Sequence, residues 1–436
     1  MTPAAGSLPK RSPGPAGPPD VATPLSISEQ ATRAGAGLID RLPPEVWEER
    51  MRRCRAEMER LEVEALLVYS AGNEVGGYEW VRYFANYVDV APLWASETWL
   101  AIPLEGEPTL FMNWHMVVER ARTFSSFTDI RCIDIWSQPE GERHDLIAPA
   151  LREWLLERGL GSARVGFGHG GRGGRWMPYT PHSVYRVMED ATEGGTLVDA
   201  SSLLWDITRV KTEYDLGMLR RVAEVNCEGL AAALDVLREG ATESDLLAEK
   251  IRRAGALGAE IADPEHCQLA VIHAFGPRPF YVTGYRFQRG DMFVVDSGAS
   301  MGGYESDIAR NAIIGPPNEI QRRTYEACME VARILEDSLR PGVVARELWE
   351  IKEVEARRLG FDHLATFAGH GVGISKNESP FLAPWDNTVI EENMVVNLEP
   401  GLFVPGEACF NYEETYIVRA EGPERITPLS SELFVA

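Results

Sequence analysis

The sequence predicts a protein of two domains, an α/β domain followed by a larger α+β domain. Strand-like runs alternate with helical runs up to about residue 205, as is typical of an α/β domain. Long amphipathic helices and β-like runs joined by glycine turns follow. The 436 residues suffice for two or three domains. We expect domains at 44–205 and 207–436, after a flexible tail rich in Pro, Gly and Ala at 1–25.

Two helices and several strands are predicted in the first domain. Good helix formers at helical spacing predict a helix over 44–62, and a second helical run over 145–160 ends next to a glycine. Apolar runs bounded by turn residues predict the strands. These strands lie at 64–71, 82–88, 97–105, 108–114 and 163–168.

The second domain combines longer helices with β-like runs. Amphipathic periodicity predicts the helices. They lie at 209–240, 243–257, 319–339 and 345–360. The β-like runs lie at 287–298, 302–315, 393–404 and 410–420.

The composition limits the partners and the compartment. A net charge of −23 would repel nucleic acid and anionic membranes, so neither is an expected partner. The sequence contains no apolar stretch long enough for a membrane helix, and its N-terminus lacks the apolar core of a secretory signal. The six cysteines are scattered and form no CxxC motif, which favours buried thiols in a reducing compartment. We expect a cytoplasmic protein.

Acidic residues and one histidine recur beside strand ends and glycine turns in the second domain. They are Asp296 in VVDSG, Asp307 in YESDIAR, His370 in AGHGVG, Glu399 in NLEPG, and Glu413 and Glu414 in NYEET. Taken singly, each of these acids is more often a solvated turn residue, and the histidine more often a satisfied one. Alternation along the last strand places Glu413 on one face and Glu414 on the other.

Convergence of these side chains would create a metal site. Buried carboxylates need cations or protons, so four of them would require two divalent metal ions. Four carboxylates with one imidazole form a hard, oxygen-rich ligand set that suits Mn²⁺, Co²⁺ or Fe²⁺ and is compatible with Zn²⁺. Bridging carboxylates could hold two ions a few ångströms apart and leave a bridging hydroxide as the nucleophile.

The second half of the sequence resembles the pita-bread metallopeptidase superfamily, which contains methionine aminopeptidase, aminopeptidase P, prolidase and creatinase. The resemblance covers about residues 207–425. RVKTEYDLGMLRRVA resembles the family's Arg-x-Lys-Ser-x-x-Glu helix, and GDMFVVDSGASMGGYESDIARN resembles its two-aspartate hairpin. GHGVGI, LEPG and NYEET resemble its histidine motif and two glutamate motifs. A smaller N-terminal α/β domain of the creatinase type points to the aminopeptidase P, prolidase and creatinase branch.

The resemblance implies a role for each residue of the set. The implied metal ligands are Asp296, Asp307, His370, Glu399 and Glu413. Asp307 and Glu413 would bridge the ions, and Glu399 would exchange protons with the bridging water. The glycines around His370 would let its backbone approach neighbouring strands closely.

The sequence departs from the peptidases of this family at the residues that handle substrate. Their histidine seven residues after the ligand histidine is Asn377 here, and their arginine two residues before the last glutamate is Asn411. Their histidine upstream of the first aspartate is missing, and aromatic residues that include Phe280 and Tyr281 occupy that region. His273 is either a substitute for it or a structural residue.

We expect a metal-dependent hydrolase of the Xaa-Pro aminopeptidase or prolidase type, which acts on a small molecule or short peptide and forms a homodimer. Glu399 and Asn377 are the expected catalytic residues, and Phe280, Tyr281 and Trp80 the expected substrate-binding ones. For Trp80, packing in the core is the alternative. An alternative function is a non-peptidase enzyme of the same fold, similar to creatinase, ectoine hydrolase or dimethylsulfoniopropionate lyase, acting on a small metabolite. A non-catalytic binding protein is a third interpretation, against which the complete ligand set argues.

Overall fold

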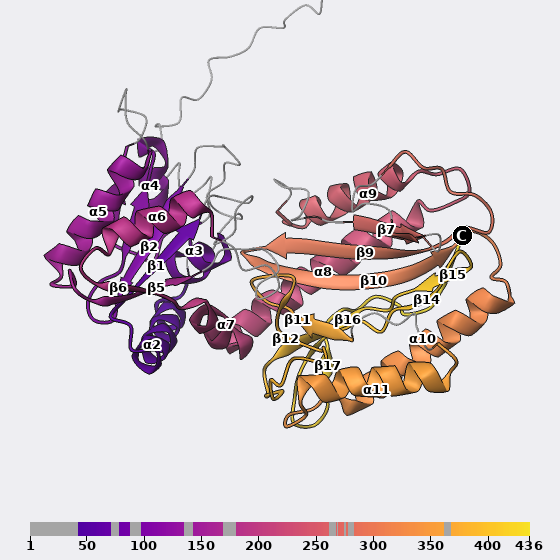
Figure 1. Cartoon of the computed structure of the whole chain (residues 1–436). Coiled ribbons are helices and arrows are strands. Elements are labelled where there is room, and N and C mark those ends of the chain that lie inside the picture. Colours follow the sequence, from indigo (N-terminus) through magenta and orange to yellow (C-terminus); the bar gives the residue numbers. More distant parts are fainter. Residues whose placement is uncertain are drawn as a thin grey trace, which may run out of the picture.

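The computed structural model describes residues 42–70, 78–87, 97–134, 143–168, 180–260, 267, 269–273, 276–277, 283–361 and 368–436. The tail expected at 1–25 lies outside these residues. Figure 1 shows a smaller N-terminal part, coloured indigo to magenta, beside a larger C-terminal part that ends in yellow. None of the described helices is both long enough and apolar enough to span a bilayer.

A mixed sheet with strand order β4-β3-β2-β1-β5-β6 forms the centre of the N-terminal domain. Its strands are β1 (Ala65–Ser70), β2 (Thr98–Pro103), β3 (Thr109–Met112), β4 (Asp129–Cys132), β5 (Arg164–Gly168) and β6 (Thr196–Asp199). Its helices are α2 (Pro44–Arg60), α3 (Tyr78–Ala85), α4 (His115–Phe124), α5 (Arg143–Glu157) and α6 (His182–Ala191). The β1–β5 and β5–β6 pairs are parallel and the β1–β2 pair is antiparallel, so the predicted α/β class is confirmed.

The strand predicted at 82–88 is wrong, because α3 (Tyr78–Ala85) occupies most of it. Aromatic residues favour strands by propensity, but the helical spacing of Trp80 and Phe84 puts both rings on one face. Both side chains are fully buried. Asn86 follows with a φ of 50°, in the left-handed region that commonly ends a helix. Burial of one apolar face therefore outweighed the local strand propensity.

The C-terminal domain contains two larger sheets, ordered β18-β10-β9-β7-β8 and β12-β11-β13-β16-β17. The strands of the first sheet are β7 (Leu269–His273), β8 (Gly276–Pro277), β9 (Met292–Met301), β10 (Tyr304–Ile313) and β18 (Phe434–Val435). Those of the second are β11 (Gly369–Gly371), β12 (Glu378–Phe381), β13 (Val395–Leu398), β16 (Glu414–Ile417) and β17 (Glu424–Arg425). β14 (Leu402–Val404) pairs separately with β15 (Ala408–Phe410). An isolated bridge between Ala309 and Glu413 joins the two large sheets.

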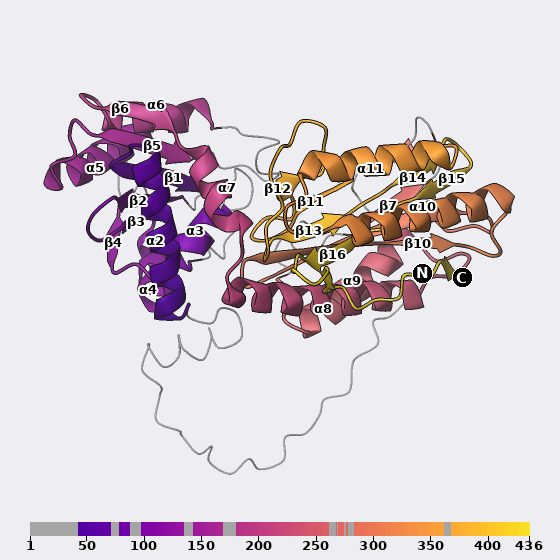
Figure 2. The same ribbon diagram turned by 90° about the horizontal axis from the view of Figure 1, so that it is seen from below.

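Helices cover the strands of this domain on opposite sides (Figures 1 and 2). They are α8 (Glu213–Asp235) and α9 (Glu243–Ala256) on one side, and α10 (Glu319–Ser338) and α11 (Ala345–Arg358) on the other. The helix predicted over 209–240 is shorter than expected. α7 (Ser201–Arg209) ends at the first residue of the predicted range, and α8 begins only at Glu213, after a capping box at Thr212.

One hydrophobic cluster extends across both domains. A single cluster of buried residues includes Phe84 of α3, Leu204 of α7, Leu216 of α8 and Met301 of β9. A polar contact reinforces it, since the buried Arg50 guanidinium of α2 donates hydrogen bonds to Asp215 Oδ1 of α8 at 2.8 Å and to the Tyr304 hydroxyl of β10. The N-terminal domain is therefore packed directly against the start of the β9–β10 hairpin turn.

A glycine turn at this contact leaves room for an arginine. Gly302 and Gly303 join β9 to β10, both with positive φ values. A Cβ atom added at Gly303 would lie 2.2 Å from Cγ of Arg82, which comes from α3. Figure 1 shows the hairpin reaching from the C-terminal part toward α3. Glycine is therefore required here both for the backbone conformation and for the close approach of the N-terminal domain.

Candidate metal centre

The β9–β10 hairpin brings two of the predicted ligands together. Asp296 pairs with Ala309 across the hairpin, and Asp307 lies two residues before Ala309 on the same face. Ligand atoms of Asp296, Asp307 and Glu413 all lie within 4.8 Å of one another. The register of the hairpin thus accounts for the eleven-residue spacing of the two aspartates.

His370 approaches the same site from β11. Its Nδ1 lies 3.0 Å from the carbonyl oxygen of Gly371, which can only accept a hydrogen bond, so Nδ1 carries the proton. The other nitrogen, Nε2, lies 3.4 Å from Asp307 Oδ2 and 3.8 Å from Glu399 Oε2. A backbone hydrogen bond of this kind fixes the tautomer that presents Nε2 to a metal ion.

The glycines around His370 allow the close backbone approach that the sequence predicted. A Cβ atom added at Gly369 would lie 2.0 Å from the carbonyl oxygen of Asn397 on β13, and Gly369 has a φ of 143°. A Cβ atom at Gly371 would lie 2.5 Å from the carbonyl oxygen of Ser379 on β12. Any larger residue would push β11 away from its neighbours, so the prediction is confirmed.

Asn411 connects the two glutamates of the predicted set. Its side-chain Nδ2 donates to Glu399 Oε1 at 2.9 Å and to Glu413 Oε1 at 2.8 Å. Its backbone N–H donates to Asn311 Oδ1 of β10 at 3.0 Å. Asn411 thus occupies the position of the arginine expected from the resemblance. It contacts both carboxylates through an uncharged amide, where an arginine would contact them through a charged guanidinium.

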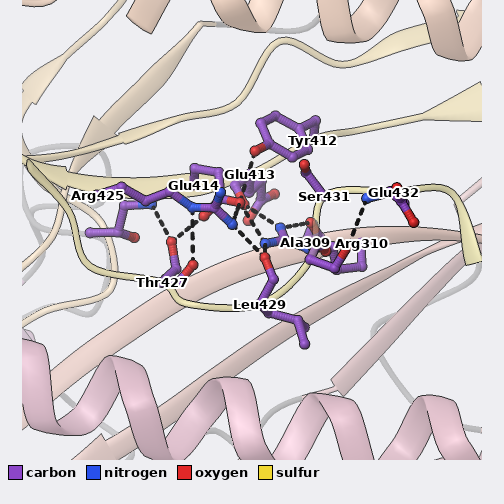
Figure 3. Close-up of polar contacts among 12 residues, drawn as sticks. Ala309, Arg310, Tyr412, Glu413, Glu414, Arg425, Thr427, Leu429, Ser431 and Glu432 are labelled. Carbon is purple, nitrogen blue, oxygen red and sulfur yellow. Dashed lines mark hydrogen bonds and ion pairs between the residues drawn. The ribbon is translucent and has the colours of Figure 1, made fainter. Parts of the chain in front are cut away.

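A buried ion-pair network lies behind Glu413 (Figure 3). Arg310 donates to the backbone oxygen of Glu413 at 3.0 Å and pairs with the Glu414 carboxylate. The Tyr412 hydroxyl and Arg425 also contact Glu414, at 2.8 Å and 2.6 Å. The adjacent glutamates therefore face opposite ways, as alternation predicted. Glu414 is a satisfied structural carboxylate, whereas Glu413 points into the site.

Lys376, which the sequence analysis did not single out, extends into the carboxylate cluster. Its Nζ lies 3.0 Å from Asp296 Oδ1 and 3.0 Å from Asp307 Oδ1. The next residue but one, Glu378, forms a buried ion pair with Lys211, which fixes the end of this loop. Composition offered a signal for Lys376, because only five of the 43 basic residues are lysines and one of them follows His370 by six positions.

The carboxylates of the cluster carry more negative charge than Lys376 and His370 can neutralise. Burial raises the pKa of the Glu413 carboxyl well above its usual range, and the Glu399 charge raises it further. Burial also acts to raise the pKa of Asp307, but Lys376 and His370 outweigh it and lower this pKa to about 2. Burial with so much negative charge is costly unless further cations are present.

The donor set fits divalent metal ions. Among the described residues, Glu413 Oε2 is buried without a hydrogen-bond partner, and Asp307 Oδ1 has only the ion pair with the Lys376 ammonium. Carboxylate oxygens left in this way are suited to coordinate a cation, and one imidazole nitrogen completes an oxygen-rich set. The residues that would hold the ions are Asp296, Asp307, His370, Glu399 and Glu413.

The other predicted site residues lie in different surroundings. Asn377 is half-buried in the loop between Lys376 and Glu378. Trp80 is fully buried, with its ring 4.8 Å from that of Trp205, so its contacts in this chain are those of a core residue. Phe280 and Tyr281 lie outside the described residues.

His273 has structural contacts. Its Nε2 lies 3.0 Å from Glu243 Oε1, and its ring packs against Phe287 and Phe293. Only 1% of the residue is exposed. Of the two interpretations of His273, these contacts favour the structural one.

Comparisons with known proteins agree with this site. Residues 217–420 match metallopeptidase family M24. An Xaa-Pro dipeptidase from Pyrococcus furiosus is 31% identical over 257 residues, which span 57% of this chain and 72% of the relative. The fold resembles that of the prolidase from Pyrococcus horikoshii OT3, with a TM-score of 0.72 and 22% identity over 88% of this chain and 100% of that one.

The fold alone does not specify an activity. The N-terminal domain of the FACT complex subunit SPT16 from chickpea has a TM-score of 0.66 at 16% identity, covering 89% of this chain and 97% of that one. The family assignment therefore rests on the sequence matches, and the resemblance to the pita-bread metallopeptidases is confirmed by them. The chain belongs to metallopeptidase family M24.

Proposed function

We propose that the chain is a metal-dependent Xaa-Pro peptidase, which hydrolyses the C–N bond on the amino side of proline. The observation that carries the proposal is the meeting of four carboxylates and one imidazole from separate segments of the C-terminal domain. Family membership and the Xaa-Pro dipeptidase of Pyrococcus furiosus support the choice of substrate.

We infer that the site binds two divalent ions, with Mn²⁺ preferred and Co²⁺, Fe²⁺ and Zn²⁺ also compatible. The two oxygens of Asp307 support a bridging role, because Oδ1 faces Lys376 and Oδ2 faces His370. Glu413 would be the second bridge. Bound ions would polarise the scissile carbonyl and activate the attacking water.

Two residues of this chain would act on the substrate directly. Glu399 would accept the proton of the attacking water and pass it to the leaving nitrogen, with Asn411 fixing its carboxylate through Oε1. Asn377, which is half-buried, would donate a hydrogen bond to the oxyanion of the tetrahedral intermediate. An amide cannot titrate near neutral pH, so the proton transfer would fall to Glu399.

A second candidate is a non-peptidase enzyme that acts on a small metabolite. Three features of the site favour it: Asn377 and Asn411 replace a histidine and an arginine, and Lys376 contacts two ligand carboxylates. A changed set of substrate-handling groups around an intact ligand set is what a change of substrate would produce.

We further infer a homodimer in the cytoplasm with a pocket partly lined by aromatic residues such as Phe280 and Tyr281. All six cysteines are unpaired thiols, which supports a reducing compartment. Light scattering coupled to size exclusion tests the dimer, for which a monomeric active enzyme is the contrary result.

Cleavage assays decide between the two functions. The full-length protein is freed of metal, loaded separately with each of the four metals, and given a panel of Xaa-Pro dipeptides and small amides. The peptidase proposal expects Xaa-Pro cleavage, lowered by Asn377→Ala, preserved or raised by Asn377→His, and abolished in the control variant Glu399→Gln. Wild-type protein that holds two metal ions but cleaves no Xaa-Pro dipeptide would promote the small-metabolite enzyme.

A further inference from the structure

Lysine is rare in this chain, and the lysines that the structure describes have interior positions. Only five of the 43 basic residues are lysines. Lys211, Lys250 and Lys352 are each at most 4% exposed, and their ammonium groups contact Glu378, the carbonyl of Gly298 and Glu353, respectively. Lys376, whose side chain is 18% exposed, is the one of these four that reaches Asp296 and Asp307.

A lysine suits the position between two carboxylates better than an arginine would. Its ammonium is a compact charge with three donors, whereas the arginine fork is wide and planar. Nζ of Lys376 donates a hydrogen bond to Asp296 Oδ1 at 3.0 Å and pairs with Asp307 Oδ1 at the same distance. An ammonium therefore neutralises one edge of the carboxylate cluster.

The same two oxygens belong to the group that could hold a metal ion. Carboxylate oxygens lie about 2.0–2.2 Å from Zn²⁺, one of the compatible ions. An ion at that distance from Asp296 Oδ1 and Asp307 Oδ1 would occupy the space of the Lys376 ammonium and repel its charge. The two cations exclude one another on this side of the cluster.

The opposite side of the cluster contains the His370 imidazole in place of a lysine. There, His370 Nε2 faces Asp307 Oδ2 and Glu399 Oε2, at 3.4 Å and 3.8 Å. The Asp307 carboxylate thus separates a side that contains Lys376 from a side that contains His370. The Lys376 side chain is 18% exposed, so rotation about its side-chain bonds is the movement by which its ammonium would leave the carboxylates for water.

We propose that Lys376 is an internal counter-cation that competes with one of two metal ions, so that the His370 side loads first and the Asp296 side loads only when the ammonium leaves. The inference rests on the proposed two-ion centre. One divalent ion with the ammonium leaves a single carboxylate charge uncompensated, whereas two divalent ions compensate all four carboxylates. The ammonium thus makes a partly loaded state tolerable and lowers the affinity for the second ion.

Calorimetric titration of the metal-free full-length protein with Mn²⁺ tests the proposal. Wild type should show two classes of site, with dissociation constants at least about tenfold apart. Lys376→Met, which keeps the length of the side chain and removes its charge, should tighten the weaker class by about 10- to 100-fold, the range seen when groups around metal ligands are changed. The stronger class should change little.

Two variants make the test selective. Arg333→Met removes an exposed cation of α10 that pairs with Asp337 at 3.1 Å, and should leave the difference between the two classes unchanged. Lys376→Gln, which is polar and uncharged, replaces Lys376→Met if that variant does not fold. Thermal unfolding of each metal-free variant checks that it is folded.

Equal affinities of the two sites in wild type, or a weaker class that neither Lys376 variant tightens, would overturn the proposal. The titration is read without peptide, so it is independent of the cleavage assay. Normal two-class metal binding without Xaa-Pro cleavage would refute the proposed activity and leave the role of Lys376 standing. Xaa-Pro cleavage by a protein with two equal sites would do the reverse.

Discussion

Replacement of Asn411 by alanine should weaken metal binding although Asn411 is not itself a ligand of the proposed centre. The change removes the hydrogen bonds from Nδ2 to Glu399 and Glu413, at 2.9 Å and 2.8 Å. A hydrogen bond to a charged group contributes about 1.5–3 kcal/mol, and loss of a group that orients metal ligands costs about 10- to 100-fold in affinity. Because two ligands lose their orientation at once, we expect the upper end, about 100-fold or about 2.8 kcal/mol.

The assay is a Mn²⁺ titration of the metal-free protein, with Asn311→Ala as the matched control. Asn311 accepts a hydrogen bond from the backbone N–H of Asn411 at 3.0 Å, and removing its amide leaves both contacts of the Asn411 side chain in place. The control should lose much less affinity. The reasoning fails if Asn411→Ala binds Mn²⁺ within about threefold of wild type, or if both variants lose affinity equally.

Three further predictions concern the ligands and the contact between the domains. Glu413→Gln should lower the metal content after dialysis more than the loss of a ligand that does not bridge, such as Asp296, because a lost bridge weakens both ions; elemental analysis that finds a greater loss for Asp296→Asn would contradict this. Arg50→Met should lower the free energy of unfolding in urea by about 3–5 kcal/mol, because the buried Asp215 loses its guanidinium partner, and a loss below about 1 kcal/mol would be too small for a buried pair. Burial raises the pKa of Asp215, but Arg50 and its hydrogen-bond partners outweigh it and bring the pKa below its ordinary 3.8, so this stabilisation is present above pH 3.8 and is lost as the pH falls through the folded-state pKa. The difference between Arg50→Met and wild type should therefore be smaller at pH 3 than at pH 7 in the same urea assay, and a difference that grows on acidification would show that the sign is wrong.

The parts of the fold that follow a strong local pattern could be predicted from the sequence. The hairpin β9–β10 combines two apolar runs with a glycine turn, and both strands formed as expected. The helix α10 has apolar residues at helical spacing and an Asn318 capping box, and its predicted bounds differ by one residue from the observed ones. The spacing of the apolar residues and the residues at turns and helix caps predict such elements without any knowledge of tertiary contacts.

The parts that depend on tertiary contacts could not be predicted. The run at 82–88 has strand-forming residues, but the burial of Tyr83, Phe84 and Ala85 in the cluster between the domains favours a helix at 82–85. Lys376 belongs to no periodic pattern, and its entry into the carboxylate cluster depends on how the loop after β11 folds over the hairpin. The contacts of Asn411 could not be predicted either, because its hydrogen bonds to Glu399 and Glu413 depend on where the three residues lie in space.

The shared core has a practical consequence for anyone who wishes to dissect this enzyme. A fragment that begins at residue 207 would contain the whole family match yet expose the apolar side of α8, where Leu216 belongs to the same buried cluster as residues of α3 and α7. The fragment would also lack Arg50, whose guanidinium neutralises the Asp215 carboxylate. The boundary predicted from the sequence is thus not a place where the chain can be divided without exposing apolar surface and a buried charge. Exchange of the N-terminal domain between relatives would require transplanting both sides of the contact together.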